Sequence, residues 1–358
     1  MNGIRGNVIV GQSGGPTAVI NSSLAGVFKT AKDRGANKVY GMLHGIQGLL
    51  QERYVDLEDH IKNDLDIELL KRTPSAYLGS CRFKLPDISQ DREIYDKIFD
   101  ILNKLEIEYF FYIGGNDSMD TIKKLSDYSL LNGSNIRFMG VPKTIDNDLA
   151  ATDHTPGYGS AAKYIGSITK EVIRDGLVYD QQNVTILEIM GRNAGWLTGA
   201  AALAKCEDCE GPDMIFLPEV TFDVDEFMKK VAELHKKKKS VVVAVSEGVK
   251  TADGRYVCEL TDGIDFVDAF GHKQLTGTAR FLAEKINREV GCKTRAIEFN
   301  SLQRCASHIV SRVDITEAYQ VGGAAVKEAF EGETGKMIIL KRVSDDPYMC
   351  ITETHDVH

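Results

Sequence analysis

Short apolar runs, Gly-rich or polar turns, and stretches with helical spacing follow one another in the first part of the chain. The run at residues 7–10 (NVIV) is typical of a buried parallel strand. After a Gly-rich turn, apolar residues recur at helical spacing, at Val19, Ile20, Leu24, Val27 and Phe28. This order predicts a strand, a turn and a helix, followed by a second strand that ends near residue 43.

The same alternation continues along the chain. Residues 94–115 have helical spacing, then an apolar run and two glycines, and residues 136–142 form a further apolar run. Alternating β and α segments predict a right-handed, mostly parallel, doubly wound sheet. Polar loops follow three of the predicted strands, and such sheets bind ligands at the carboxyl ends of their strands.

A second α/β pattern begins after residues 155–162 (TPGYGSAA). Its predicted elements are a helix from Ala161 to Arg174, a strand at 183–191, a helix near 195–204, a strand at 213–219, a helix at 227–239 and a strand at 240–248. The sequence therefore predicts an α/β fold of two doubly wound, mostly parallel α/β/α lobes, with the active site in the cleft between them.

Composition and charge exclude several classes of protein. The net charge of −9 and the pI of about 5.5 argue against a nucleic-acid partner. No apolar stretch reaches the roughly 20 residues of a membrane span, so no membrane partner is expected. An odd number of cysteines and no signal-peptide pattern at residues 1–8 predict a reduced, cytoplasmic protein.

Two further patterns are expected to be structural. The lysines at 236–239 suit the negative end of a helix dipole, so we interpret them as a solvated helix end. Cys206 and Cys209 form a lone CxxC, and no second Cys/His pair lies at zinc spacing. We therefore expect no metal or redox role for this pair.

Two Gly-rich turns precede predicted helices. A turn of this kind at residues 11–21 (GQSGGPTAVIN) can hold phosphate, because backbone N–H groups point outward and the helix dipole favours an anion. The second turn, at residues 112–121 (YIGGNDSMDT), places Asp117 where a phosphate would be repelled. The position of this acidic residue requires an explanation.

Charged residues gather after three other predicted strands. Lys143, Thr144, Asp146 and Asp148 crowd one loop (VPKTIDNDL), a concentration of charge that an ordinary turn does not have. Arg192 follows the strand that ends in EIMG. The stretch at residues 294–308 (TRAIEFNSLQRCASH) contains Arg295 and Arg304, and arginines can bind a phosphate through two parallel hydrogen bonds.

The motifs GGxxS, TIDND, MGR and QR, in this order, resemble those of the phosphofructokinase superfamily. The resemblance extends from Gly11 to about Lys336 and is closest to the pyrophosphate-dependent branch, which also has the patterns NAGWLT, FLPEV and FGHKQLTGTARFLAEKI. It implies transfer of phosphate from pyrophosphate to the 1-hydroxyl of fructose 6-phosphate, a reversible step of glycolysis that requires Mg²⁺. It also implies a homodimer or homotetramer.

The resemblance gives Asp117 and Lys143 a role in the choice of donor. In ATP-using members both positions are typically Gly, whereas pyrophosphate-using members typically have Asp and Lys. A carboxylate at Asp117 would repel the α-phosphate of ATP, and pyrophosphate ends before reaching it. Lys143 would stabilise the phosphoryl group during transfer.

The remaining donor-side and catalytic roles follow from the same motifs. Asp146 is expected to be the general base that accepts the proton of the sugar hydroxyl. Thr144 would orient the phosphoryl group, and Asp148 would support the metal or the loop. The further residues expected to bind the donor are Gly14 and Gly15 through backbone N–H groups, and Arg82 with the assistance of Lys84.

The expected acceptor residues lie in the second half of the chain. Met190, Gly191, Arg192 and Glu247 match positions that hold the sugar, and Arg192 is also expected to be catalytic. Arg295 and Arg304 match positions that bind the 6-phosphate, and in the family one such arginine comes from a neighbouring subunit. The donor lobe is expected at residues 1–157 with about 303–340, and the sugar-phosphate lobe at about 158–302 with 341–358.

Three positions differ from the family pattern. The magnesium ligand, usually Asp, is Asn116, whose amide oxygen can bind Mg²⁺ but adds no charge. An arginine expected before the strand VTILEIMG is Asn183, and the His of the usual GHIQR is Ser301. The last two changes concern the acceptor more than the donor.

Several alternative functions remain compatible with these residues. The same fold could act on sedoheptulose 7-phosphate or a polyol, or could use ATP. A non-catalytic subunit that senses sugar phosphates would have no need of the base Asp146. A dinucleotide oxidoreductase is disfavoured, because no GxGxxG follows the first strand.

Overall fold

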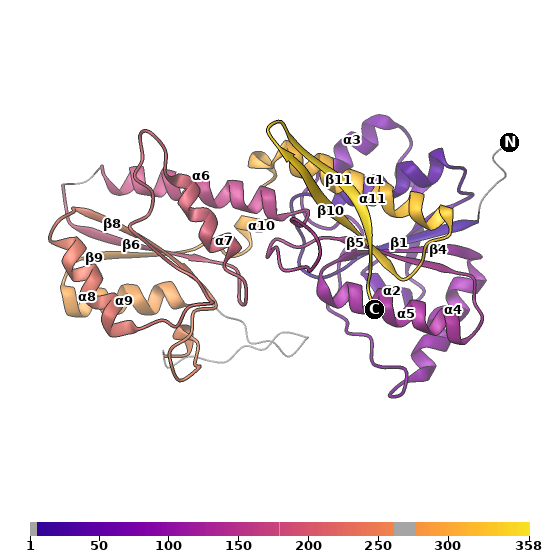
Figure 1. The fold of residues 1–358 in the computed structure, drawn as a ribbon, viewed down its shortest axis with the longest axis horizontal. Helices are drawn as coiled ribbons and strands as arrows, with labels where there is room; N and C mark the ends of the chain where they lie inside the picture. The colour runs from indigo at the N-terminus through magenta and orange to yellow at the C-terminus, as the bar shows by residue number, and fades with distance from the viewer. Residues whose placement is uncertain (1–5, 179, 261–276) are drawn as a thin grey trace. The chain divides into compact units, whose positions relative to one another are not determined.

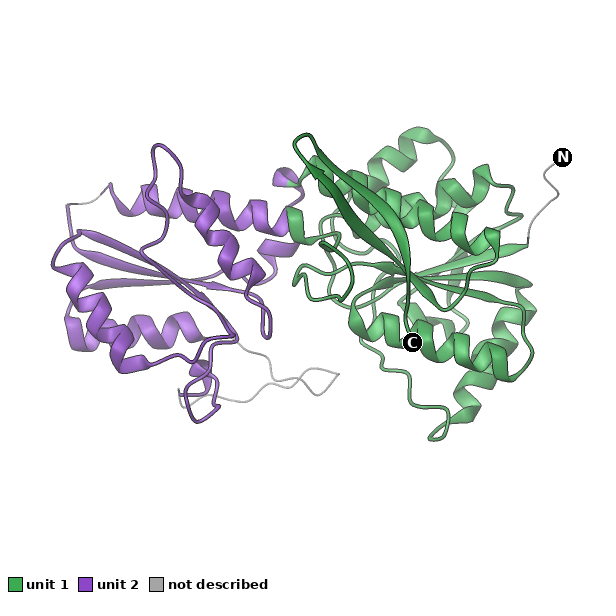
Figure 2. Ribbon diagram, viewed as in Figure 1, with its two compact units in different colours: residues 1–159, 310–358 green, residues 160–309 purple. Residues whose placement is uncertain are grey.

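The computed structural model describes residues 6–178, 180–260 and 277–358. The chain divides into two compact units, unit 1 (residues 1–159 and 310–358) and unit 2 (residues 160–309), which are coloured separately in Figure 2. Residues 341–358, which the sequence assigned to the second lobe, lie in unit 1, and residues 303–309, which it assigned to the donor lobe, lie in unit 2. The long-range strand pairing described next accounts for the first of these differences.

Unit 1 contains a seven-stranded sheet with the strand order β11-β10-β5-β4-β1-β2-β3. Its elements are β1 (Asn7–Gln12), α1 (Ile20–Asp33), β2 (Val39–Met42), α2 (Gly45–Leu49), β3 (Tyr54–Asp56), the 3₁₀ helix η1 (Leu57–Asp59), α3 (Asp64–Arg72), α4 (Arg92–Lys104), β4 (Ile107–Gly114), α5 (Asn116–Leu131), β5 (Arg137–Pro142), α11 (Arg312–Glu331), β10 (Lys336–Asp345) and β11 (Tyr348–Asp356). Strand β10 runs parallel to β5, and β11 returns antiparallel to β10.

Helices cover both faces of this sheet (Figure 1). One core packs α1, α3 and α11 against one face, and a second core packs α2, α4 and α5 against the other. Helix α4 shows how the sequence produces this arrangement. Its apolar residues Tyr95, Ile98, Phe99 and Leu102 are buried at helical spacing, and the Asp91 side chain accepts a hydrogen bond from Ile94 N at its start.

Helices α1 and α11 approach each other closely. A Cβ atom added at Gly26 would lie 2.1 Å from the carbonyl oxygen of Tyr319, and one at Gly322 would lie 2.1 Å from the carbonyl oxygen of Ser23. Only glycine permits this backbone contact, so the two glycines fix how α11 packs beside the first βα unit.

The central strands of unit 1 end at one edge of the sheet. Strand β1 pairs in parallel with β4, and Gln12 lies opposite Ile113. Strand β4 pairs in parallel with β5, and Gly114 lies opposite Pro142. The Gly-rich turn, the start of α5 and the loop after Pro142 are therefore neighbours.

Unit 2 contains a four-stranded, entirely parallel sheet with the order β7-β8-β6-β9. Its elements are α6 (Tyr158–Gly176), which begins at the boundary, β6 (Asn183–Ile189), α7 (Trp196–Gly199), η2 (Ala200–Ala204), β7 (Met214–Phe216), α8 (Val224–His235), β8 (Ser240–Ser246), η3 (Val257–Leu260), α9 (Thr278–Val290), β9 (Lys293–Glu298), α10 (Leu302–Cys305) and η4 (Ser307–Ile309). Figure 1 shows α6 and α7 on one face of the sheet and α8 and α9 on the other. The predicted α/β fold with mostly parallel sheets is confirmed.

The patterns interpreted as structural are ion-paired or hydrogen-bonded. Beyond the end of α8, Lys238 forms ion pairs with Glu210 at 2.7 Å and Asp213 at 2.9 Å. Cys206 and Cys209 exchange two backbone hydrogen bonds, and all seven cysteines are free thiols. Among the described helices, none has the length and apolar character needed to cross a membrane.

Candidate active site

Backbone hydrogen bonds join the three loops at the carboxyl edge of the unit 1 sheet. Ser13 N donates to Ile113 O at 2.9 Å, and Lys143 N donates to Gly114 O at 3.0 Å. A Cβ atom at Gly115 would lie 3.5 Å from the carbonyl oxygen of Lys143. The structure therefore brings together the Gly-rich turn, the start of α5 and the charged loop, as the sequence predicted.

Lys143 is a buried cation directed at the Gly-rich turn. Its side chain follows β5, the residue is only 3% exposed, and Nζ donates to Gly15 O at 2.6 Å. Gly14 has a φ of 73°, and a Cβ atom there would lie 3.3 Å from the same Nζ. A buried ammonium group is stabilised by an anion. The turn and the lysine together form a place where phosphate would be favoured.

The opposite side of the Gly-rich turn contacts the loop that carries Arg82. Ser80 Oγ donates to Gly14 O at 2.6 Å, and Gly14 N donates to Cys81 O at 3.1 Å. Arg82 and Lys84 are both exposed beside this contact. The Gly14 N–H, which the sequence assigned to pyrophosphate, is thus engaged with Cys81 in this structure.

Helix α5 begins at this edge of the sheet with Asn116 and Asp117. Its N-cap is Gly115, which provides no side-chain cap, and both following residues are exposed. The first N–H groups of a helix attract anions, whereas the Asp117 carboxylate in the first turn repels them. At this edge of the sheet, Lys143 therefore attracts a phosphate anion, whereas Asp117 repels one.

The loop that carries Asp146 is held by hydrogen bonds within unit 1. Thr144 Oγ1 accepts from Asp146 N at 3.1 Å, so the threonine orients the backbone of the expected base. Asn147 has a φ of 56°, a conformation that Asn tolerates, and its Oδ1 accepts from Thr155 N at 2.9 Å. Thr155 Oγ1 in turn donates to Thr144 O at 2.8 Å. Sequence reasoning missed Asn147 and Thr155.

Asn116 and Asp148 form the oxygen-rich part of this edge. Asn116 Nδ2 donates to Asp148 Oδ2 at 3.0 Å, and both residues are partly accessible to solvent. Desolvation of the carboxyl group by the surrounding loops raises the pKa of Asp148, although the nearby Lys143 opposes that shift. Because the amide nitrogen faces the carboxylate, the amide oxygen of Asn116 is directed elsewhere and is available as a ligand.

In unit 2, the expected sugar-binding residues meet at the carboxyl ends of β6 and β8. Gly191 has a φ of 128°, Ser246 Oγ donates to Gly191 O at 2.7 Å, and Gly191 N lies 3.5 Å from Glu247 Oε1. A Cβ atom at Gly248 would lie 2.0 Å from the carbonyl oxygen of Arg192. The two strand ends are therefore packed backbone to backbone.

Helix α10 joins the same edge of unit 2. Met190 N donates to Gln303 Oε1 at 3.3 Å, and Arg304 is the next residue of this helix. The structure thus brings Arg304 close to Met190 in one unit. Ser301, which replaces the expected histidine, is the N-cap position of α10 and is exposed.

Arg295 lies within the amino-terminal half of β9, away from the carboxyl edge of the unit 2 sheet. It is opposite Thr185 in the pairing of β9 with β6, six residues before Gly191, a separation of about 20 Å along a strand. Its Nη1 forms an ion pair with Asp175 Oδ2 at 2.7 Å. It lines a small cavity with Gly176, Gln181, Asn183 and Lys293. Within one unit 2, Arg295 and Arg304 are therefore directed to different parts of the sheet, Arg295 toward Asp175 and Arg304 at the carboxyl edge.

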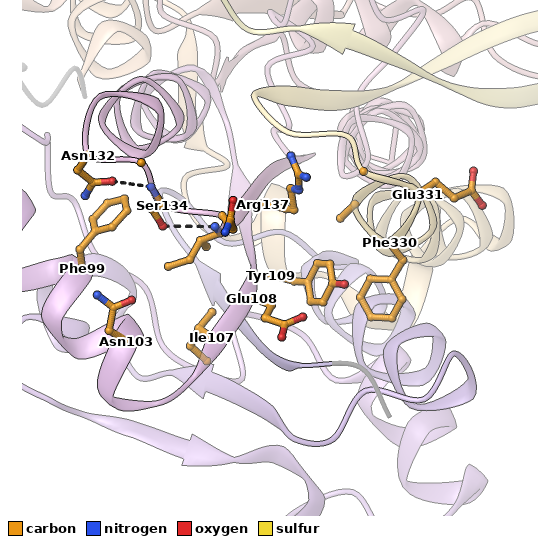
Figure 3. A pocket seen from close by; sticks show the side chains of 15 residues that line it. Phe99, Asn103, Ile107, Glu108, Tyr109, Asn132, Ser134, Arg137, Phe330 and Glu331 are labelled. Atoms are coloured by element: carbon orange, nitrogen blue, oxygen red, sulfur yellow. Dashed lines mark hydrogen bonds between the residues drawn. The ribbon is translucent and has the colours of Figure 1, made fainter. Parts of the chain in front are cut away.

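One cavity of unit 1 lies away from the residues at the carboxyl edge of that unit's own sheet. It has a volume of about 700 Å³ and lies at the amino ends of β4 and β5, where Ile107, Arg137 and Phe330 contribute to its walls (Figure 3). Strand β4 has eight residues, so about 25 Å separates its two ends. Asn132 and Ser134 there form local hydrogen bonds that stabilise the turn after α5.

Part of one predicted motif lies outside the described residues. The segment FGHKQLT, at residues 270–276, is not described, and the structure begins again at Gly277.

Glu188, a buried residue of β6 that sequence reasoning missed, accepts a hydrogen bond from Ala279 N at 2.8 Å. Desolvation raises the pKa of Glu188 to about 7. Glu188 thereby anchors the start of α9.

Comparison with known proteins agrees with these motifs. The phosphofructokinase family matches residues 7–329. The pyrophosphate–fructose 6-phosphate 1-phosphotransferase of Halomonas elongata is 40% identical over 351 residues, which cover 97% of this chain and 82% of that protein. The enzyme of the same name from Xanthomonas campestris is 41% identical over 346 residues, covering 96% of this chain and 81% of that protein.

A solved structure gives the same result at the level of the fold. The pyrophosphate-dependent phosphofructokinase of Marinobacter aquaeolei superimposes with a TM-score of 0.86 and 35% sequence identity, covering 99% of this chain and 83% of that chain. Sequence, fold and the grouping of residues at the sheet edges agree, and the chain belongs to the phosphofructokinase family.

Proposed function

We propose that the chain is a phosphotransferase that moves phosphate between pyrophosphate and the 1-hydroxyl of fructose 6-phosphate, in either direction. The observation that carries this proposal is the buried Lys143 ammonium beside Gly14 and Gly15, with Asp117 at the start of α5. A coupled assay with fructose 6-phosphate and either pyrophosphate or ATP tests it. Turnover with pyrophosphate is expected, and turnover with ATP alone would exclude the proposed donor.

The donor side of the reaction depends on charge placement in unit 1. Phosphoryl transfer needs positioning and charge neutralisation more than covalent catalysis. Lys143 and Arg82 supply positive charge, and the turn at Gly14 and Gly15 contributes backbone dipoles. The Asp117 carboxylate would repel the α-phosphate of a longer donor, so it discriminates against ATP without touching pyrophosphate.

The acceptor is proposed to be held by residues at the carboxyl edge of the unit 2 sheet. Asp146 accepts the proton of the acceptor's 1-hydroxyl during attack on the phosphoryl group. Thr144 orients both the phosphoryl group and the loop. Glu247 and the backbone of Met190, Gly191 and Arg192 hold the sugar. The free thiols are compatible with a cytoplasmic location.

Mg²⁺ is proposed to bind at Asn116 with support from Asp148. Both offer oxygen ligands, and Mg²⁺ in such sites keeps several waters and is shared with substrate phosphates. The ion would supply charge that neutralises the phosphate oxygens. The Asn116–Asp148 hydrogen bond of 3.0 Å holds the two side chains at the distance of direct neighbours.

Replacing Asn116 by Asp is expected to lower the half-saturating Mg²⁺ concentration of the reaction. Two neighbouring carboxylates repel each other until a divalent cation lies between them, so the cation should bind more tightly. The Mg²⁺ dependence of the initial rate measures this effect. Ser118→Ala is not a suitable control, because the Ser118 hydroxyl is hydrogen-bonded to Ser13. An unchanged or higher half-saturation value would remove Asn116 from the metal site.

Arg295 is proposed to bind the 6-phosphate of an acceptor held by a neighbouring subunit in a homo-oligomer. Its place in the amino-terminal half of β9, beside Lys293 and about 20 Å along the strand direction from Gly191 at the carboxyl edge, supports this proposal. Lys293 adds a positive charge near Asn183, where the family arginine is missing. The 6-phosphate therefore still meets two cations.

Mixing two variants that are impaired in different ways tests whether Arg295 acts between subunits. Arg295→Ala should raise the KM for fructose 6-phosphate by about 10-fold or more, since a hydrogen bond to a charged group contributes about 1.5–3 kcal/mol. Oligomers refolded from equal amounts of Arg295→Ala and Asp146→Asn chains should regain activity at low acceptor concentration. In these mixed oligomers, some active sites combine the native Asp146 of the Arg295→Ala chain with the native Arg295 of the Asp146→Asn chain. Mixtures no more active than the sum of the separate variants would contradict the proposal.

A different phosphorylated acceptor remains the second candidate. Ser301 and Asn183 alter the acceptor side, and both differ from the family pattern. The kcat/KM for sedoheptulose 7-phosphate divided by the kcat/KM for fructose 6-phosphate distinguishes the two candidate acceptors. A ratio above one would replace fructose 6-phosphate as the proposed acceptor and leave the donor unchanged.

A further inference from the structure

His154 lies between two carboxylates in unit 1. Its Nδ1 is 2.8 Å from Asp153 Oδ2, and its Nε2 is 2.7 Å from Glu317 Oε2 on α11. The side chains of His154 and Glu317 are only 13% and 6% exposed. Carboxylates accept hydrogen bonds and do not donate them, so both ring nitrogens must carry a proton. With both acids ionised, this geometry fits an imidazolium cation.

The C-terminal hairpin completes the charge environment of His154. Arg342 of β10 lies 3.0 Å from the same Asp153 oxygen and also pairs with Asp345. On β11, Tyr348 donates its hydroxyl hydrogen to Glu317 Oε1 at 2.6 Å. The Cys350 thiol lies close to Asp153 and His154. His154 and Arg342 together balance the charges of Asp153 and Glu317, and the additional carboxylate, Asp345, is exposed to solvent.

The balance of these contacts favours the charged form of His154. Burial alone would lower the pKa of His154, but the hydrogen bonds to Glu317 and Asp153 outweigh it and raise the pKa above its ordinary value. Deprotonation would leave the buried Glu317 carboxylate without its cation. An unpaired buried charge is strongly unfavourable, so loss of the proton should release this contact.

The residues next to His154 hold the loop of the proposed base. Thr155 N donates to Asn147 Oδ1, and Thr155 Oγ1 donates to Thr144 O, at 2.9 Å and 2.8 Å. Thr144 N donates to Pro156 O at 3.2 Å. Residues 154–156 therefore form the second side of the loop that carries Thr144 and Asp146, and His154 fastens that side to α11.

We propose that the His154 imidazolium, through its contact with Glu317, is a positioning residue that holds the Thr144–Asp148 loop in the geometry required for phosphoryl transfer. This inference rests on the proposed function, because it assumes that Asp146 acts in that loop. The contact is complete below the pKa of His154 and is lost as the pH rises through it. The turnover number should therefore fall on the alkaline side with a midpoint set by His154.

The pH dependence of kcat in wild type, Glu317→Gln and His154→Gln tests the proposal. A glutamine at position 317 can accept the Tyr348 hydroxyl and donate to a neutral imidazole, so it favours the uncharged form of His154. Glu317→Gln should shift the alkaline limb of kcat to lower pH by about one unit, since loss of an adjacent charge changes a pKa by about that amount. His154→Gln should lower kcat about 10-fold near pH 7 and remove that limb.

Two controls separate positioning from general stability. His355→Gln replaces an exposed histidine of β11 and should leave both the limb and kcat unchanged. The melting temperature of each variant reports any loss of fold. An alkaline limb that stays at the wild-type pH in Glu317→Gln, even with a lowered melting temperature, would overturn the proposal. Absence of pyrophosphate-dependent turnover in wild type would instead overturn the proposed function, and this inference with it.

Discussion

Replacing Asp146 by Asn is expected to lower kcat by roughly 10²–10⁴-fold, the usual contribution of a positioned general base. Asn keeps the size of the side chain and cannot accept the hydroxyl proton. The backbone of residue 146 is held by Thr144 Oγ1 at 3.1 Å, so the loop should keep its conformation. The KM for fructose 6-phosphate should change little, because the sugar contacts proposed in unit 2 are untouched.

A matched surface variant makes the Asp146→Asn result specific. Asp59→Asn changes an exposed carboxylate of η1 in the same unit and should leave kcat unaltered. Single-turnover and steady-state rates should fall together in Asp146→Asn if chemistry is the step affected. A variant that keeps more than half of wild-type turnover would exclude Asp146 as the base.

Replacing Lys143 by Gly is expected to abolish most pyrophosphate turnover. The ammonium group is buried, so water cannot replace its charge when the side chain is removed. Loss of one such stabilising group typically costs about 10²–10³ in kcat. Lys143→Met keeps most of the side-chain volume without the charge and should lose a similar factor, which separates the effect of charge from the effect of an enlarged site.

Replacing Asp117 is expected to change the rate with ATP, the donor that competes with pyrophosphate. Asp117→Gly removes a carboxylate at the first turn of α5 and should allow measurable use of ATP. It should not reach the pyrophosphate activity of wild type, because an adenine pocket need not exist. The Asp117→Gly/Lys143→Gly double variant should use ATP better than either single variant, since the lysine side chain would otherwise occupy part of the nucleotide's path.

The sequence was sufficient to predict the elements that position the donor side. Strands β1, β4 and β5 are short apolar runs ended by Gly or polar loops, which are local signals. Because parallel strands end at one edge, the association of Gly14, Asp117 and Lys143 followed without knowledge of the fold. Family resemblance then supplied roles that spacing alone does not give.

The C-terminal hairpin and the contact of His154 with Glu317, beside the loop that carries Asp146, could not be predicted in this way. Strand β10 pairs with β5 only at Lys336 and Met337, and no local pattern specifies a partner so far away in sequence. His154 meets Glu317 across 163 positions. Its neighbours in sequence, TPGYG, indicate a turn but not which helix that turn contacts.

Arg295 shows a different limit of motif reasoning. Arg295 and Arg304 are nine positions apart, and both were assigned to the 6-phosphate, with one of them expected from a neighbouring subunit but without specifying which one. The parallel pairing of β9 with β6 places Arg295 in the amino-terminal half of β9, whereas Arg304 follows the carboxyl edge. The order of residues in a motif does not specify the end of the strand at which each side chain lies.

The most direct test of the account is kcat/KM for pyrophosphate and for ATP, with fructose 6-phosphate as acceptor, in wild type and in the Asp117→Gly, Lys143→Gly and double variants. Wild type should strongly prefer pyrophosphate, Lys143→Gly should lose that activity, and ATP use should rise in Asp117→Gly and again in the double variant. A wild-type enzyme that already prefers ATP would contradict the roles of both Asp117 and Lys143.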